Sequence, residues 1–400
     1  RTLGEVMQAT KNTLSSVYKL GFCLIGDPAV KIAYPEFGMK VTTVNGQSVD
    51  GNSISFKALE KITVEGEVLD ASGQLVTDFT GIVNPTVKDS KVTVTCLKNS
   101  NKDDSPAFTF TDYPNTIFIG NDSVRNGKFS FTFTVPKDIS YSNLQGKMNL
   151  YAVDTESGNE AQGNFDNFIV GGTSDTAETD TIGPEIRALY LNDTTFVDGG
   201  QVNTTPYFVA ELWDKSGVNI TGSSVGHDMM LVIDESTVLS YNLNSYYELL
   251  PGEDGTGIVK FPIPALEPGK HTAEFWVWDI LNNSTVRTFT FEVVEGLKPF
   301  LFDVIATPGI AREQVTFHLM HNRPESRMRV GIMVYDLAGR QLWKHEESGT
   351  SGLFENYTVS WDLTSGGARM RPGVYIYRAA ISTDNSKDAT KARKFIILGE

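Results

Sequence analysis

The sequence has few cysteines, few histidines and no long hydrophobic run. Its 400 residues include 2 cysteines and 5 histidines. Two cysteines cannot form the disulfide framework of a small secreted scaffold. Because Cys23 and Cys96 also fall in different expected domains, we expect two buried thiols rather than a disulfide between them. The longest apolar stretches, such as Ala392–Leu398, fall far short of the roughly 20 residues that a membrane-spanning helix needs, so we expect no membrane span.

Positive charge is scarce as well. Lys and Arg number 34 against 49 for Asp and Glu, which gives a formal net charge of −15. Such a surface repels the phosphate backbone, so we expect no nucleic-acid partner. Hydrophobic residues make up 40% of the chain. The chain can therefore bury sizeable cores, and its length exceeds what one core fills, so we expect two to four domains.

Helical patterns occur in one place only, at the start of the chain. The first residues show no positively charged, apolar signal pattern, and we expect the sequence to be a piece of a longer chain. Apolar residues recur close to a 3.6-residue period over 3–20, which predicts one amphipathic helix. The apolar run Gly21–Ile25 follows and predicts a buried strand. A lone helix and strand have no partner of their own, so we interpret 1–38 as the end of an α/β domain.

The remainder predicts short strands joined by turns rich in Gly, Thr, Asn and Ser. Within 128–135, Phe129, Phe131 and Phe133 alternate with polar residues, which is typical of a strand with one buried face. We therefore predict a mainly β chain of tandem immunoglobulin-like sandwiches at 39–170, 184–295 and 296–400, with a Thr-rich acidic linker at 171–183. The strands expected are 62–69, 92–96, 128–135, 147–153, 186–191, 207–213, 229–233, 271–278, 286–293, 315–319, 329–335, 357–361, 373–378 and 393–398.

Three groups of residues resemble known proteins. Phe22–Pro35, with the sequence FCLIGDPAVKIAYP, resembles the segment that closes the caspase-like catalytic domain of gingipain-type cysteine peptidases. Residues 334–342, 361–362, 371–378 and 394–398 resemble the C-terminal sorting sandwich of type IX secretion substrates. Residues 212–219, 226–228 and 276–283 are similar to the central region of the surface sortase of that system. The resemblance covers essentially the whole chain, as the C-terminal part of such a sortase.

This resemblance implies a fold, an activity and a location. The fold is a short helix-strand remnant of a caspase-like α/β domain followed by the sandwiches. The activity is that of an upstream peptidase domain, in which a Cys nucleophile with a His partner cleaves the sorting domain from secreted proteins and transfers the product to an anionic lipopolysaccharide. The location is the bacterial cell surface, outer membrane-associated or extracellular, with an outer-membrane barrel protein of the secretion system as partner.

The catalytic pair of that family lies before the strand that Phe22–Ile25 matches. No residue of this chain inherits a catalytic role, and we assign no catalytic, cofactor-binding or metal-binding residue and no cofactor. Cys23 lies in an apolar run with no histidine nearer than His227, and burial raises a thiol pKa. We therefore interpret Cys23 as a packed core thiol.

Two metal sites deserve comparison. His318 and His321 are three apart on an expected strand and point to opposite faces, which disfavours zinc, and His227, His271 and His345 are isolated in the sequence. A calcium site near Asp214, Asn219 and Asp228 is more plausible, because Ca²⁺ takes carboxylate and carbonyl oxygens from loops. Asp and Asn in such loops more often bond their own backbone as turn formers, so calcium is left open.

Paired Trp-Asp dipeptides, Trp213-Asp214 and Trp278-Asp279, predict two strand ends that turn alike. Trp276 and Trp278 share a face that we expect to be core, although they and Tyr246-Tyr247 also suit stacking on a sugar.

Two linker tripeptides, Asp175-Thr-Ala177 and Asp180-Thr-Ile182, look like O-glycosylation acceptors at Thr176 and Thr181. A solvated acidic spacer is the favoured interpretation, since short patterns arise by chance in Thr-rich sequence.

We therefore expect a non-catalytic chain that serves support and docking for a gingipain-like peptidase and sortase. The alternative is a stand-alone surface adhesin or glycan-binding protein, and a third hypothesis is one half of a nicked peptidase. The helix-strand unit at 1–38 favours the peptidase, because an adhesin has no use for it.

Overall fold

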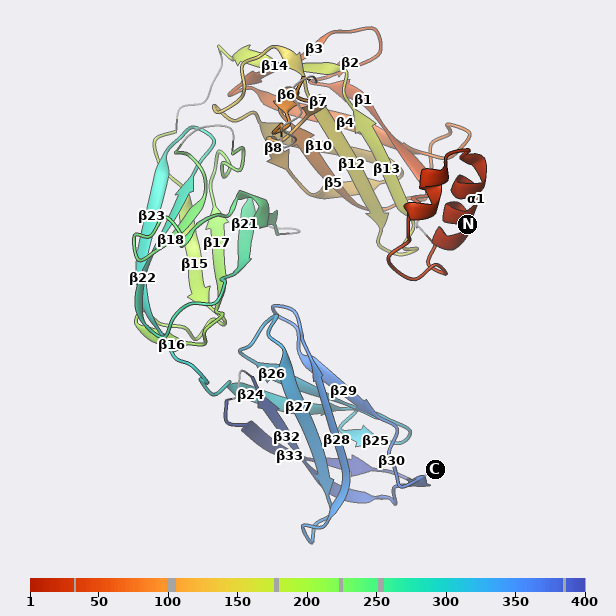
Figure 1. Cartoon of the computed structure of the whole chain (residues 1–400), viewed down its shortest axis with the longest axis vertical. Coiled ribbons are helices and arrows are strands. Elements are labelled where there is room, and N and C mark those ends of the chain that lie inside the picture. Colours follow the sequence, from red (N-terminus) through yellow and green to blue (C-terminus); the bar gives the residue numbers. More distant parts are fainter. Residues whose placement is uncertain are drawn as a thin grey trace. The chain divides into compact units, whose positions relative to one another are not determined.

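The computed structural model describes residues 1–31, 34–98, 106–175, 180–222, 226–250, 255–383 and 386–399 (Figure 1). The chain is mainly β and follows the predicted order of a helical start and three groups of strands. It divides into two compact units, Arg1–Val135 with Ile139–Ala177, and Pro136–Asp138 with Glu178–Glu400. The second and third strand groups share the second unit. Within the described ranges, no helix is long and apolar enough to cross a membrane.

The predicted helix over 3–20 is two shorter helices. α1 (Leu3–Thr13) begins with a capping box, in which the Thr2 hydroxyl accepts the Glu5 N–H and the Glu5 carboxylate accepts the Thr2 N–H. After Thr13 the backbone becomes extended at Leu14, and Ser16 caps a separate 3₁₀ turn, η1 (Val17–Gly21). A serine that bonds the N–H of a residue two positions on starts a new turn rather than continuing a helix, which explains the break.

The buried strand predicted over 21–25 is wrong. Residues 22–25 form no strand, and Phe22, Cys23 and Ile25 are exposed. The buried thiol predicted at Cys23 is therefore also wrong. A strand is stabilised by bonds to a neighbouring strand, and the described part of this chain pairs none with 22–25. Residues 28–30, further along the chain, bond the start of α1 instead: the Leu3 N–H donates to the Val30 carbonyl at 2.8 Å and the Gly4 N–H to the Pro28 carbonyl at 2.9 Å.

The first strand group forms one ladder that closes on itself. It runs in the order β12, β13, β1, β4, β10, β9, β5, and β5 pairs back with β12, while β11, β14 and β3 form a second sheet. The core is the inner face, where Phe129, Phe131 and Phe133 of β10 are buried as predicted. The elements are β1 (Phe37–Val44), β2 (Gln47–Ser48), β3 (Ile54–Ala58), β4 (Lys61–Leu69), β5 (Gly81–Lys88), β6 (Val92–Thr95), β7 (Thr109–Asp112), β8 (Thr116–Ile119), β9 (Asp122–Arg125), β10 (Lys128–Thr134), β11 (Leu144–Gln145), β12 (Lys147–Asp154), β13 (Glu160–Phe165) and β14 (Phe168–Thr173).

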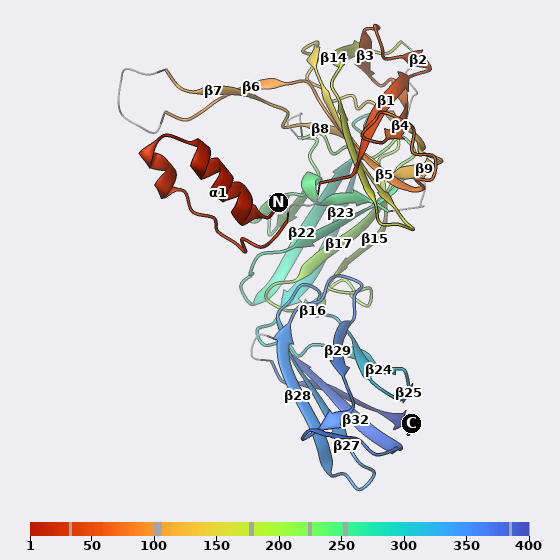
Figure 2. The ribbon, with the colours of Figure 1, turned by 90° about the vertical axis from the view of Figure 1, so that its right-hand side faces the viewer.

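One hairpin leaves this group. β6 and β7 pair only with each other among the described strands, and Figure 2 shows them projecting from the rest of the unit. Cys96 follows β6 and is half-buried, so the second predicted buried thiol is partly exposed. The exposed rings of Phe108 and Phe110 stack on this arm, with centroids 6.4 Å apart.

The second strand group is a sandwich of two sheets. One sheet has the order β15, β17, β21, β20, and the other has the order β16, β23, β22, β18, β19. β14 extends to Thr173, so residues 171–173 of the predicted linker belong to a strand. The elements are β15 (Glu185–Leu191), β16 (Gly200–Val202), β17 (Tyr207–Trp213), β18 (Met230–Ile233), β19 (Ser240–Asn242), η2 (Asn244–Tyr246), β20 (Tyr247–Leu249), β21 (Thr256–Pro262), β22 (Gly269–Trp278) and β23 (Ser284–Val293).

The third strand group is a second two-sheet sandwich, with the sheets β24, β26, β29 and β25, β33, β32, β27, β28. Its last strand lies between β25 and β32 and is paired on both sides. Phe317, Tyr377 and Phe395 fill its core. The elements are β24 (Leu301–Thr307), β25 (Ile310–Ala311), β26 (Val315–His321), β27 (Met328–Tyr335), β28 (Gln341–Gly349), β29 (Tyr357–Trp361), β30 (Thr364–Ser365), β31 (Ala368–Arg369), β32 (Gly373–Ser382) and β33 (Ala389–Ile397).

Candidate functional site

The cysteines and the histidines belong to different compact units of the chain. Cys23 belongs to the first compact unit, whereas all five histidines belong to the second. Three of these histidines contact carboxylates. His227 lies 2.6 Å from Asp138, His271 lies 2.7 Å from Asp234, and His345 lies 2.9 Å from Glu347. These contacts orient the imidazole rings against their own domain rather than toward a thiol.

The pair His318 and His321 does not form a metal site. Both lie on β26 and, being three residues apart, face opposite sides of the sheet. Burial lowers the pKa of His321 to about 4, and the Arg323 charge adds to this. His321 is therefore neutral at pH 7, with Nδ1 accepting the Arg323 N–H at 3.1 Å and Nε2 within 2.8 Å of the Ser351 hydroxyl.

Three aspartates meet at one end of the second sandwich. Asp180, Asp214 and Asp279 place carboxylate oxygens within 4.8 Å of one another. Asp214 follows β17 and Asp279 follows β22, which belong to opposite sheets, and Asp180 comes from the connection before β15. The two sheets therefore bring together carboxylates that are far apart in the sequence.

The two strand ends turn alike, as the Trp-Asp dipeptides predict. The Asp214 carboxylate accepts the N–H groups of Ser216 and Gly217 at 2.7 and 2.9 Å. The Asp279 carboxylate accepts those of Leu281 and Asn283 at 2.9 and 2.7 Å. Each aspartate thus caps the turn that follows its own strand.

The three carboxylates in this cluster repel one another. Burial raises the pKa of Asp214 to about 6, and repulsion from the other two carboxylates adds to the effect. Burial also raises the pKa of Asp279. Asp180 differs, because the Ser216 hydroxyl donates to it at 2.7 Å and lowers its pKa. Carboxylate oxygens are the ligands that Ca²⁺ prefers, so these three residues are the ones that could contribute to a cation site, with other oxygens completing the coordination.

This cluster shares only Asp214 with the sequence prediction. Asn219 is buried and bonds Thr221 and Asp138 instead, and Asp228 accepts a bond from Asn244 at 2.8 Å. Sequence reasoning used Asp279 only as a turn former and missed its role beside Asp214. The repeated Trp-Asp ending of two strands was the available signal, because alike strand ends in facing sheets can meet.

The aromatic prediction is partly wrong. Trp276 and Trp278 share a face as predicted, but this face is the outer one, and both rings are half-exposed. Ala273, Phe275 and Val277 occupy the inner face of β22. The strand therefore buries Ala273, Phe275 and Val277 and leaves the indoles outside, where Trp278 packs against His227 with centroids 4.5 Å apart.

The two tyrosines of that prediction also differ from each other. Tyr247 is buried and Tyr246 is exposed. Of the two linker threonines, Thr176 lies outside the described residues, and Thr181 is exposed.

Comparison with solved structures relates the chain to PorU and to immunoglobulin-like repeats. A crystal structure of dimeric latent PorU from Porphyromonas gingivalis is 37% identical over 100% of this chain, and the match covers 38% of the PorU chain with a TM-score of 0.42. A tetra-tandem repeat from the extending region of a large adhesion protein is 14% identical over 91% of this chain and 74% of that one, with a TM-score of 0.19. The N-terminal Ig1-2 module of the Drosophila receptor protein tyrosine phosphatase DLAR is 9% identical over 54% of this chain and 98% of that one, with a TM-score of 0.22. No protein-family model and no curated protein matches the chain.

The identity along the whole chain relates it to a part of PorU, of which it spans 38% of the length. The chain is a mainly β, PorU-related polypeptide of tandem immunoglobulin-like sandwiches.

Proposed function

We propose that this chain is the non-catalytic C-terminal part of a cell-surface cysteine peptidase and sortase of gingipain type, which processes and anchors substrates of type IX secretion. Its own role is to support the upstream peptidase domain and to dock the enzyme. The identity with PorU supports the relation, and the apolar surface of residues 1–31 is the single observation that carries the role.

This surface is unusually apolar for a segment outside any core. Val17 and Leu20 of η1 are about three-quarters exposed, and Phe22 and Ile25 are 63% and 98% exposed. A groove of about 480 Å³ beside them is lined in part by Met7 and Leu20. Contiguous exposed apolar surface marks an interaction site, and the resemblance of 22–35 to the end of a caspase-like domain supports the rest of that domain as the partner.

The third sandwich supplies the docking role in this proposal. Its strands β27, β32 and β33 contain the residues that resemble the sorting sandwich of secretion substrates. A module of that type would hold the protein at the outer membrane through a barrel partner, while the first two sandwiches act as spacers.

The test is co-expression of this chain with the polypeptide encoded immediately upstream, as two separately tagged chains. The upstream polypeptide should co-purify and carry the Cys-dependent peptidase activity, and this chain alone should have none, with or without Cys23→Ser. Ile25→Asp should abolish co-purification, because it places a charge in the apolar contact. Val238→Asp is the matched control, since Val238 is 83% exposed in the second unit.

Two results would overturn the proposal. Upstream sequence without a caspase-like domain would leave the adhesin alternative, for which the outward-facing Trp276 and Trp278 are the candidate sugar platform. Co-purification that survives Ile25→Asp would place the peptidase contact elsewhere.

A further inference from the structure

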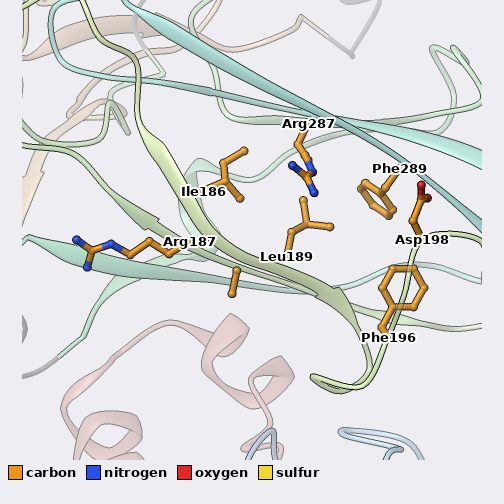
Figure 3. Close-up of a pocket in the computed structure, with 8 residues that line it drawn as sticks. Ile186, Arg187, Leu189, Phe196, Asp198, Arg287 and Phe289 are labelled. Carbon is orange, nitrogen blue, oxygen red and sulfur yellow. The ribbon is translucent and has the colours of Figure 1, made fainter.

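The second sandwich has an open side between its two sheets. β15 and β23 belong to different sheets and face each other across a cavity of about 240 Å³ (Figure 3). Ile186, Leu189, Phe196 and Phe289 give the cavity apolar walls, and Arg287 lines it from β23. This cavity shares no lining residue with the aspartate cluster and takes no part in the function proposed above.

The outer edge of β23 is only partly paired. β16 pairs with its last three residues alone. Just before them, the Thr290 N–H donates to Asp198 at 2.6 Å and the Thr290 carbonyl accepts the Gly199 N–H at 2.8 Å, so both groups point outward. Backbone groups in an antiparallel ladder alternate with a period of two, so those of Val286 and Thr288 point outward as well. β22 pairs with these two residues on the inner side, and in the described structure no strand pairs with them on the outer side.

The facing edge of β15 is also free. The Asn192 N–H donates to the Tyr207 carbonyl at 2.7 Å, so the backbone groups of the even-numbered residues before it, such as Tyr190, point toward β17. Leu189 is odd-numbered, so its N–H and carbonyl point the other way, to the open side. Both rims of the cavity therefore present unpaired backbone groups above an apolar floor.

Arg287 is the cation that reaches into this opening, and Asp198 is the carboxylate at its rim. It has the same parity as Phe289 and Phe291, which are buried in the core, so its side chain is directed toward the inside of the sandwich. Figure 3 shows Arg287 reaching into the opening, whereas Arg187 points away from it. Arg187 bonds Thr256 at 2.7 Å. Arg287 shares the cavity lining with Asp198 and its charge helps to lower the Asp198 pKa, but the Asp198 carboxylate bonds the Thr290 N–H and hydroxyl, and the described structure gives no hydrogen bond or ion pair between Asp198 and Arg287.

An inward charge on an edge strand has a simple alternative role, because it blocks pairing between edges. A strand that covered Arg287 would bury an unpaired guanidinium, which is strongly unfavourable unless the strand brings a carboxylate. The same residue therefore rejects most strands and accepts one that carries an acid in the right place.

We propose that this opening binds an extended, acidic segment of a partner polypeptide by β-strand addition. The segment pairs with Val286 and Thr288, places a carboxylate against Arg287 and inserts an apolar side chain over Phe289. Arg287 and Phe289 are two residues apart on one face, so the residues of the bound segment that lie opposite them are also two apart. The segment therefore reads acid-x-apolar if it runs parallel to β23 and apolar-x-acid if it runs antiparallel.

The experiment measures binding of fluorescent peptides of about ten residues, made of Ser and Thr apart from one motif. The motif is Asp-x-Val or its reverse, Val-x-Asp, and further peptides replace Val by Leu or Phe. The peptides with one of the two motif orders should bind the whole chain, and those with the other order should not. Arg287→Glu should weaken that binding at least tenfold and should instead bind the peptide in which Lys replaces Asp. Thr288→Pro should also abolish binding, because it removes an outward N–H while leaving the bonds to β22 intact. Arg378→Glu, an exposed arginine of β32, is the control for the charge change.

Three outcomes would overturn the proposal. Failure of every peptide, together with self-association of Arg287→Leu in sedimentation equilibrium, would show that Arg287 only protects the edge. Binding that survives Arg287→Glu would place the peptide elsewhere. Concentration-dependent dimers of the unmodified chain that dissociate in Thr288→Pro would identify a second copy as the occupant.

Discussion

Asp214 is a carboxyl group whose ionisation the fold opposes. It is 7% exposed and lies beside two other carboxylates, and its pKa rises to about 6 from an ordinary value of 3.8. The folded state therefore holds its proton over a range in which the unfolded chain has lost it. The stability that this proton confers is complete below pH 4 and is lost as the pH rises through 6.

Asp214→Asn should remove this loss. The amide oxygen can still accept the N–H groups of Ser216 and Gly217, but it carries no charge. Above pH 6 the variant should be more stable than the parent by about 1–3 kcal/mol, and near pH 4 the two should converge. Urea unfolding of the second unit between pH 4 and 7.5, with EDTA present to remove divalent cations, measures this. A parent stability that does not fall between pH 4 and 6 would contradict the burial argument.

Asp154 provides a contrast of opposite sign in the first unit. Its carboxylate accepts the N–H groups of Thr80, Glu156 and Ser157, and these bonds lower its pKa to about 2. Its contribution to stability is present above pH 4 and is lost as the pH falls through 2. Asp154→Asn should therefore weaken the first unit at pH 7 and flatten its acid unfolding, whereas Asp214→Asn should leave this unit unchanged.

Cys23 and Cys96 differ in exposure and should differ in reactivity. Cys23 is exposed and Cys96 is half-buried behind β6. In the native chain, Cys23 should react rapidly with a thiol reagent such as Ellman's reagent, and Cys96 should react more slowly. Full titration after unfolding without reductant should give two thiols. Loss of the fast phase in Cys23→Ser identifies it, and equal rates at the two cysteines would contradict the structure.

At the scale of single residues, sequence reasoning succeeded where one strand determines the outcome. The alternation around Phe131 fixed its burial, because neighbours on a strand point to opposite faces. It failed for Trp276, although Lys270, Thr272 and Glu274 share its face of β22 and mark that face as the outer one. It also missed Asp180 beside Asp214, since the contact is made only after two sheets have packed.

At the scale of elements, the terminal strand β33 is central to its sheet. It pairs with β32 along its length and with β25 at its end, and Phe395 and Ile397 are buried. Deleting residues 394–400 should therefore unfold the third sandwich, because it removes a ladder and opens the core. Limited proteolysis should cut that sandwich and spare the first. Deleting only the last two residues should leave it protected, and protection of the longer deletion would show that β33 is dispensable.

The same reasoning explains which elements could be predicted. β10 and β33 follow from local alternation and from the length of an apolar run. Residues 22–25 carry an equally good strand pattern and form none, because pairing depends on a neighbour that the local pattern does not contain. Ser16, which caps the 3₁₀ turn and ends the first helix, is visible in the sequence as a possible helix start. The apolar residues, however, keep a helical period across it, so the sequence predicted one continuous helix.

At the scale of the whole molecule, the two compact units have separate cores. The core around Phe131 lies entirely within residues 39–170, and the core around Phe317 lies entirely within the third sandwich. The folding free energy of each unit therefore depends mainly on its own side chains. This separation would let a surface protein lose or renew one module without unfolding the others.

Matched substitutions test that separation. Phe131 and Phe317 are both buried, so Phe131→Ala and Phe317→Ala should each cost about 3–5 kcal/mol. In differential scanning calorimetry, Phe131→Ala should lower the transition of the first unit by several degrees and leave the other transition in place, and Phe317→Ala should do the reverse. Tryptophan fluorescence assigns the second-unit transition, because all five tryptophans lie there. A single transition that both variants shift equally would mean that the cores unfold together, and the chain would then be one cooperative body.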